Sequence, residues 1–123
     1  WAEMADKTFK VFSNEINRVP SGYTSMVTAF LFEYDHPKEI VVVGSGSDPA
    51  TQVALTRMKS EYIPGKILLF KDTDQLSPGL SPLAKWTATQ ETIDDKVTFY
   101  VCQDFACKIP TTDIKEALIF IHE

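Results

Sequence analysis

The sequence predicts an α/β fold: a small, mainly parallel sheet with an antiparallel edge hairpin, flanked by helices and preceded by a helical hairpin. Three observations predict this fold. Residues 40–43 and 67–70 are continuous aliphatic or β-branched runs, as expected of strands that are buried on both faces. An amphipathic segment with its own start and stop signals separates the two runs, as in a βαβ unit. A third strand-like run, residues 97–102, is followed by another helix start.

The first 35 residues have helical periodicity. Apolar residues recur at helical spacing in two stretches, first Trp1, Ala5, Phe9, Phe12 and Ile16, and then Tyr23, Met26, Val27, Phe30, Leu31 and Tyr34. Pro20 and Gly22 interrupt the pattern, because proline disfavours a helical residue before it. We therefore expect an antiparallel helical hairpin over residues 1–35 and a separate α/β domain over residues 36–123.

The helices of the α/β domain have clear N-terminal signals. Asp48 is followed by a proline, which suits the first helical position, so we expect a helix over residues 49–62 with Asp48 as its N-cap. Asp113 is the expected N-cap of a last helix over residues 113–121. Glu116 stands three residues further on, as the partner in a capping box.

The segment over residues 71–96 has no clear pattern. Its Ser-Pro-Gly and Ser-Pro sequences, at residues 77–79 and 81–82, predict turns. We expect one short helical turn near residues 83–86. A connection of this length inside a compact domain is expected to carry function or to pack over the core.

Both cysteines lie in the predicted edge hairpin. Residues 103–106 fit a four-residue loop between the strand over residues 97–102 and a short returning strand over residues 107–109. Cys102 and Cys107 are then expected to lie opposite each other.

The C-x4-C spacing leaves the chemistry of Cys102 and Cys107 open. It is neither the C-x-x-C of a dithiol oxidoreductase nor half of a recognisable zinc site. The functional interpretations are a reversible disulfide or half of a metal site. The favoured interpretation is structural, with two unpaired, small apolar side chains on the inner face of the hairpin. We expect no bound metal and no cofactor.

The Gly-Ser-Gly-Ser turn after the first strand is a candidate anion site. Gly44, Gly46 and Ser47 lie between a buried strand and a helix start, where backbone N–H groups and the helix dipole favour a phosphate. The pattern is neither G-x-G-x-x-G nor a P-loop, and Asp48 places a negative charge where the phosphate would lie. A tight turn is the favoured interpretation, with small-anion or nucleotide binding at residues 44–48 as a weaker alternative. No set of residues suggests a catalytic site.

Composition and charge exclude several classes of partner. The net charge is −5 and the basic residues are scattered singly, which argues against a nucleic-acid or anionic-membrane partner. No apolar run approaches the about 20 residues that span a bilayer, and no signal peptide is recognisable. We expect a cytoplasmic location. Because the chain begins at Trp1, we also expect it to be an excised or processed fragment of a longer protein.

Residues 98–113 contain a Tyr-Val-Cys sequence, a polar pair ending in Asp104, an aromatic residue, Cys107, Pro110 and a Thr-Asp ending at Asp113. This pattern resembles the C-terminal end of thioredoxin-domain-containing proteins of the bacterial YyaL and spermatogenesis-associated type. The preceding order is similar too: a helix pair with a proline break, an Ile-Val-Val strand ending in glycine, a helix and an aliphatic strand. The resemblance therefore covers most of the chain.

The resemblance implies a place in a larger architecture. Members of that family carry a thioredoxin-like domain, a toroid of helical hairpins and a small α/β region. Residues 1–35 would then be the closing helices of the toroid, with the remainder of the parent chain as their partner. A hairpin taken from a toroid has too many large apolar groups for one stripe, so we expect an apolar patch on residues 1–34 or self-association.

The function implied by the resemblance is that of a non-catalytic accessory domain, not an enzyme. No catalytic residue carries over, because the active-site cysteines of the thioredoxin-like domain have no counterpart here. The alternative is a redox element in which Cys102 and Cys107 exchange with the thioredoxin-like site of the parent protein.

Overall fold

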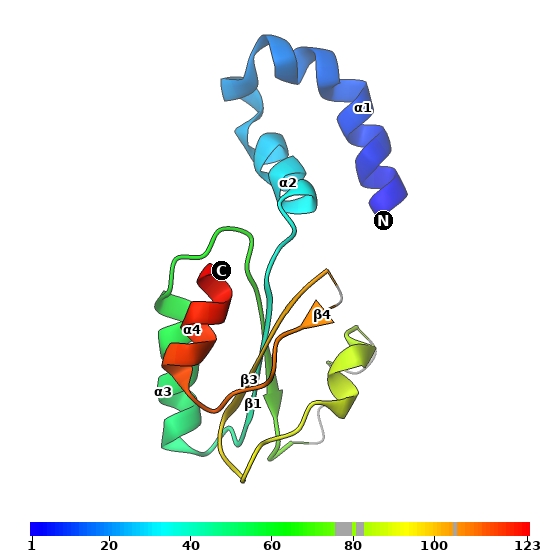
Figure 1. Cartoon of the computed structure of the whole chain (residues 1–123). Coiled ribbons are helices and arrows are strands. Elements are labelled where there is room, and N and C mark those ends of the chain that lie inside the picture. Colours follow the sequence, from blue (N-terminus) through cyan, green and yellow to red (C-terminus); the bar gives the residue numbers. More distant parts are fainter. Residues whose placement is uncertain (76–79, 81–82, 105) are drawn as a thin grey trace. The chain divides into compact units, whose positions relative to one another are not determined.

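The computed structural model of the chain describes residues 1–75, 80, 83–104 and 106–123 (Figure 1). The chain divides into two compact units, a helical unit, Trp1–His36, and an α/β unit, Pro37–Glu123. Each unit is described by itself. The predicted turns at residues 77–79 and 81–82 lie outside the described residues.

The helical unit contains the two predicted helices. Its elements are α1 (Ala2–Arg18), the short 3₁₀ helix η1 (Pro20–Tyr23) and α2 (Thr24–Tyr34). Aromatic contacts join the two helices: the Phe9 and Phe30 rings meet edge to face with centroids 5.4 Å apart, and Phe12 lies 6.2 Å from Tyr23. These pairs hold a two-helix unit whose other apolar side chains remain largely exposed.

The α/β unit contains the predicted strands and helices, displaced by no more than a few residues at their ends. Its elements are β1 (Glu39–Gly44), α3 (Pro49–Ser60), β2 (Ile67–Asp72), η2 (Lys85–Thr89), β3 (Thr98–Gln103), β4 (Ala106–Cys107) and α4 (Ile114–His122). The helical turn expected near residues 83–86 is η2, which begins two residues later.

The four strands form one mixed sheet in the order β2-β1-β3-β4. β1 and β2 are parallel, as predicted, whereas β3 runs antiparallel to β1, and β4 antiparallel to β3. The α/β class is confirmed, but the sheet is mixed and not mainly parallel. The reason lies in the connection after β2. An antiparallel β3 starts at the end of the sheet where β2 finishes, so no crossover helix is needed to return the chain.

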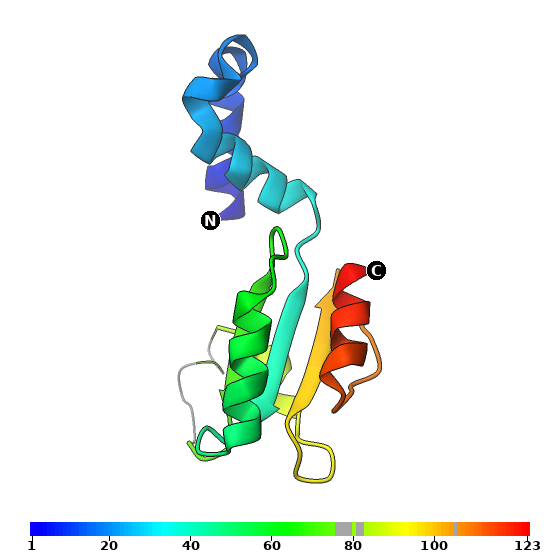
Figure 2. The same ribbon diagram turned by 90° about the vertical axis from the view of Figure 1, so that its left-hand side faces the viewer.

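The two faces of the sheet are covered differently. α3 and α4 lie on one face, and η2 lies on the other (Figures 1 and 2). Ile40 and Val42 of β1 join the core against α3 and α4, whereas the alternating Val41 and Val43 point to the η2 face. All four side chains are fully buried. The core on the helix face consists of Ile40, Val42, Ala54, Leu55, Met58, Phe99, Val101, Ala117 and Ile121.

Lys71 helps to fasten the segment around η2 to the sheet. The Lys71 ammonium, on β2, donates hydrogen bonds to the backbone carbonyls of Thr87 at 2.9 Å, Ala88 at 3.0 Å and Gln90 at 2.5 Å. The described residues of the long connection around η2 therefore pack over the core, one of the two roles expected from its length.

Both predicted N-caps are confirmed. Asp48 accepts a hydrogen bond from the Ala50 N–H at 3.1 Å, and Asp113 accepts one from the Lys115 N–H at 2.8 Å. Each bond satisfies a donor that the first turn of a helix leaves without a partner.

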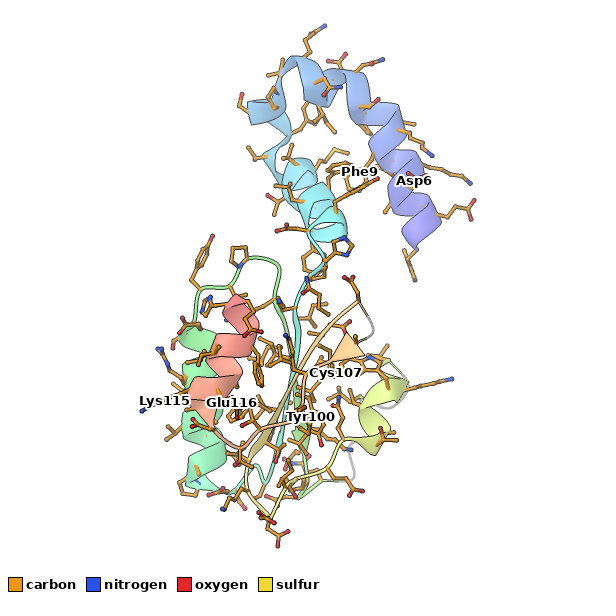
Figure 3. All side chains as sticks on the ribbon, viewed as in Figure 1. Asp6, Phe9, Tyr100, Cys107, Lys115 and Glu116 are labelled. Atoms are coloured by element: carbon orange, nitrogen blue, oxygen red, sulfur yellow. A yellow bond between two sulfur atoms is a disulfide. The ribbon has the colours of Figure 1, made fainter. Side chains whose placement is uncertain are left out.

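The predicted capping box at α4 is wrong. Thr111 takes the place of Glu116 as the acceptor for the Asp113 N–H, at 3.1 Å, and the Thr111 hydroxyl donates to the Glu116 carboxylate (Figure 3). The cause is tertiary. Backbone hydrogen bonds in both directions pair Thr111 with Phe99 of β3, which fixes its hydroxyl beside the start of the helix.

Substitution of Phe99 by alanine should lower the free energy of unfolding of the α/β unit by about 3–5 kcal/mol, because it leaves a cavity under both helices. The ring is 1% exposed. Urea denaturation followed by circular dichroism measures the change. Leu83→Ala, at a side chain that is 91% exposed, is the control and should stay within about 0.5 kcal/mol of the unsubstituted chain. Equal effects of the two substitutions would contradict this description of the core.

Candidate functional site

The hairpin formed by β3 and β4 brings the two cysteines together. Cys102 pairs with Cys107 and Gln103 with Ala106, so the register expected for the cysteines is confirmed. The connecting loop has two residues and not four, because β3 continues to Gln103. Asp104, with φ of 51°, begins the turn, and a positive φ is common in such short hairpin loops.

Cys102 and Cys107 form a disulfide, with the two sulfur atoms 2.07 Å apart. The favoured interpretation of two unpaired thiols was therefore wrong. The Lys108 N–H donates to the Val101 carbonyl at 2.9 Å, so the cysteines form the adjacent, non-hydrogen-bonded pair, in which the two strands lie closest. Cys102 is buried at 2% exposure, whereas Cys107 is exposed at the edge of the sheet (Figure 3).

A cavity of about 370 Å³ lies beside the disulfide on the η2 face of the sheet. We call it the η2 cavity. Its lining residues are Glu39, Trp86, Thr89, Gln90, Tyr100, Cys102, Cys107, Lys108 and Pro110. Glu39 is opposite Cys102 in the strand register, so both side chains point to this face. The strand pairing thus places a carboxylate next to the disulfide.

The Tyr100 ring is held rigidly in the wall of the η2 cavity. Its hydroxyl donates to the Glu91 carbonyl at 2.8 Å and accepts from the Glu91 N–H at 3.1 Å. These two bonds join β3 to the segment after η2, and the ring lies near the middle of the α/β unit (Figure 3).

The Gly-Ser-Gly-Ser turn is filled by two carboxylates from the end of β2. Asp72 accepts from the Gly46 N–H at 2.8 Å, and Asp74 accepts from the Ser47 N–H at 2.9 Å. The Ser45 hydroxyl donates to Asp74 at 2.7 Å. The hydrogen bond from Ser45 is the largest cause of a lowered pKa at Asp74, followed by that from the Ser47 N–H.

These carboxylates occupy the donors that an anion would need. A side chain at Gly46 would place its Cβ 2.5 Å from the Asp72 carboxylate, and one at Gly44 would lie 2.7 Å from the Thr51 hydroxyl. A side chain at either glycine would therefore displace the neighbouring side chain. The geometry favours the tight-turn interpretation over an anion or nucleotide site.

A metal-ligand cluster and a membrane-spanning helix are both absent from the part of the chain that the structure describes. No group of three or more His, Cys, Asp or Glu side chains there is placed to hold a metal ion. No helix there is long and apolar enough to cross a membrane.

Comparison with known proteins identifies similar sequences in mammals. Spermatogenesis-associated protein 20 of Homo sapiens is 31% identical over 122 residues, and the proteins of that name from Rattus norvegicus and Mus musculus are 29% and 28% identical over 123 residues. The chain is homologous to a region of spermatogenesis-associated protein 20. This homology confirms the resemblance. No protein-family model and no solved structure matches the chain.

The homologous region is a small part of spermatogenesis-associated protein 20. The match includes 99–100% of the present chain but only 15–16% of the length of these relatives. Both units of the chain, helical and α/β, therefore lie within the matched region.

Sequence reasoning missed several residues of the two candidate sites. Asp72 ends β2 and Asp74 follows two residues later. Because the carboxyl ends of parallel strands meet at one edge, the approach of both carboxylates to the turn after β1 could have been predicted. No sequence signal indicated that Trp86 and Gln90 line a cavity. Their position depends on how the connection after β2 folds back over the sheet.

Substitution of Gly46 by alanine should lower the free energy of unfolding by about 1–3 kcal/mol, because the new methyl group displaces Asp72 and breaks its charge-assisted hydrogen bond. Urea denaturation measures the loss. Thr73→Ala, at an exposed neighbour, should change it by less than about 0.5 kcal/mol. In an Asp72→Ala background the cost of the alanine at Gly46 should shrink, because the clashing carboxylate is gone. An unchanged cost in that background would contradict the contact.

Proposed function

We propose that this chain is a non-catalytic accessory domain within a larger protein of the spermatogenesis-associated protein 20 type. The observation that carries the proposal is the extent of the homology, which includes both units of this chain yet only 15–16% of each relative. A small region retained as a whole within a much longer protein is expected to pack against the rest of it. In this proposal the partner is a helical toroid, formed by the part of the parent chain that precedes this region.

The surface of the helical unit supports this proposal. None of its described side chains is buried. Its exposed large apolar residues, here called the hairpin surface, are Trp1, Met4, Val11, Phe12, Val19, Phe30, Leu31, Phe32 and Tyr34. The exposure of these side chains agrees with the apolar patch that the sequence led us to expect on residues 1–34. A patch of this kind marks a contact surface, because water-exposed apolar area is costly and promotes association.

A second candidate function rests on the disulfide. Cys107 is an exposed residue and Cys102 a buried one, so an external thiolate is expected to reach the disulfide from the side of Cys107. Attack on Cys107 would form a mixed disulfide and release Cys102 as a thiolate, and a second thiol would complete the exchange. A dithiol of the thioredoxin type in the parent protein is the proposed partner.

The accessory function can be tested in the full-length parent protein. Replacing Val11 and Leu31 by serine should lower its unfolding free energy by about 1.5–3 kcal/mol for each side chain that packs against the toroid. These two side chains are 76% and 55% exposed in the present chain, so their loss costs little within the helical unit itself. Tyr62→Ser, at an 86% exposed residue of the α/β unit, is the control and should have little effect. A double variant as stable as the unsubstituted parent would argue against docking through the hairpin surface.

The accessory and redox functions differ in the activity of the chain alone. As an accessory domain, the pre-reduced chain should not accelerate the reduction of insulin by dithiothreitol above the uncatalysed rate, as measured by turbidity. Acceleration that disappears in both Cys102→Ser and Cys107→Ser would reject the accessory-domain hypothesis in favour of redox exchange. Acceleration that persists in both variants would indicate a contaminant and would be consistent with the accessory-domain hypothesis.

A further inference from the structure

Two of the residues that line the η2 cavity carry hydrogen-bond acceptors that lack donors. The Gln90 side chain is 5% exposed, and its Oε1 atom is buried without a hydrogen-bond partner. The half-buried Glu39 carboxylate has no ion-pair or hydrogen-bond partner within the described part of the chain. Both residues line the same cavity. Buried acceptors normally have partners, so this pair indicates a missing donor-rich group.

The remaining walls of the η2 cavity suit a flat cation. Trp86 and Tyr100 contribute aromatic surface, and Tyr100 is fixed by its bonds to the Glu91 backbone. Lys108 also lines the cavity, but its ammonium is paired with a residue outside the lining. Its ammonium forms an ion pair with Glu123 at 2.8 Å and lies 6.0 Å from the Phe120 ring, on α4. The charge inside the cavity is therefore that of Glu39.

We propose that the η2 cavity binds the guanidinium group of an arginine side chain presented by another polypeptide segment. A guanidinium has five N–H donors in one plane, can form two parallel bonds to a carboxylate and stacks on aromatic rings. Glu39 would accept its bidentate bond, Gln90 a further N–H, and Trp86 or Tyr100 would stack on its face. The volume of about 370 Å³ lies within the range of small-ligand cavities and exceeds what one guanidinium needs, which leaves room for its aliphatic stem.

The test is a titration of the whole chain with N-acetyl-arginine amide. The chain has two tryptophans, so a Trp1→Phe variant makes Trp86 the one fluorescent reporter. Saturable change in Trp86 fluorescence is expected. N-acetyl-citrulline amide, which has a similar shape but no charge, should bind at least about tenfold more weakly, because the charge-assisted bonds are lost. N-butylguanidine, a guanidine of the same single charge without peptide groups, distinguishes a small-molecule ligand from a peptide-borne arginine by binding more tightly than the amide.

Three substitutions make the assignment specific. Glu39→Gln should weaken binding of the arginine amide about tenfold or more, whereas Glu91→Gln, at an adjacent glutamate whose side chain does not line the cavity, should leave it unchanged. Gln90→Met should weaken binding without lowering the melting temperature of the unliganded chain, because it removes an unsatisfied acceptor. This last readout separates a ligand-binding role from a structural one.

Several results would overturn the proposal. These are the absence of any saturable response, equal binding of the arginine and citrulline amides, and an affinity unchanged by Glu39→Gln. Tighter binding of N-butylguanidine than of the amide would retain the guanidinium site and reject a peptide-borne ligand.

Discussion

The enclosure of β1 is the constraint on which the α/β unit depends. Residues 40–43 are fully buried, and β1 has a strand on each side, so neither its faces nor its edges meet water. Burying four such β-branched side chains contributes on the order of 1.5–3 kcal/mol each, which requires a cover on both faces of the sheet. α3 and α4 supply one cover, and the connection around η2 supplies the other.

Two lysines, one just before β2 and one on it, donate hydrogen bonds to backbone carbonyls in the segments that cover the sheet. Lys71 holds the carbonyls around η2, and Lys66 donates to the Met58 carbonyl at 2.7 Å, the Lys59 carbonyl at 3.3 Å and the Glu61 carbonyl at the end of α3. A cation near the last carbonyls of a helix satisfies acceptors that have no intrahelical donor, and it is favoured by the helix dipole. Lys71 therefore holds the segment around η2 against the sheet, and Lys66 holds the end of α3 near the start of β2.

The sequence predicted those features that depend on local pattern. The strands over residues 40–43 and 67–70 and the N-caps Asp48 and Asp113 follow from composition and spacing, and the structure confirms them. The direction of β3 could not be predicted in the same way, because it depends on the path of the chain between two strands. Thr111 displaced Glu116 at the start of α4 for a similar reason, since a tertiary contact to Phe99 positions it.

The candidate sites show the same division. Their glycines and cysteines could be read from the sequence, whereas the groups that decide their chemistry come from distant segments. The turn after β1 is filled by Asp72, the last residue of β2, and by Asp74, which lies just beyond it. The disulfide and Glu39 become neighbours only through the pairing of β3 with β1. The pairing of Cys102 with Cys107 could be predicted from the hairpin, but the C-x4-C spacing does not reveal whether two opposed cysteines are bonded.

The shortness of β4 affects how this sheet behaves towards other copies of the chain. An exposed strand edge is a template on which further strands can add, and repeated addition builds cross-β aggregates. β4 has two residues, and the chain beyond it carries a charged residue at Lys108 and a proline at Pro110, which lacks an N–H donor. The disulfide also ties β4 to β3, so this edge cannot lengthen easily by rearrangement. The disulfide and the proline thus protect this edge of the sheet against the addition of further strands.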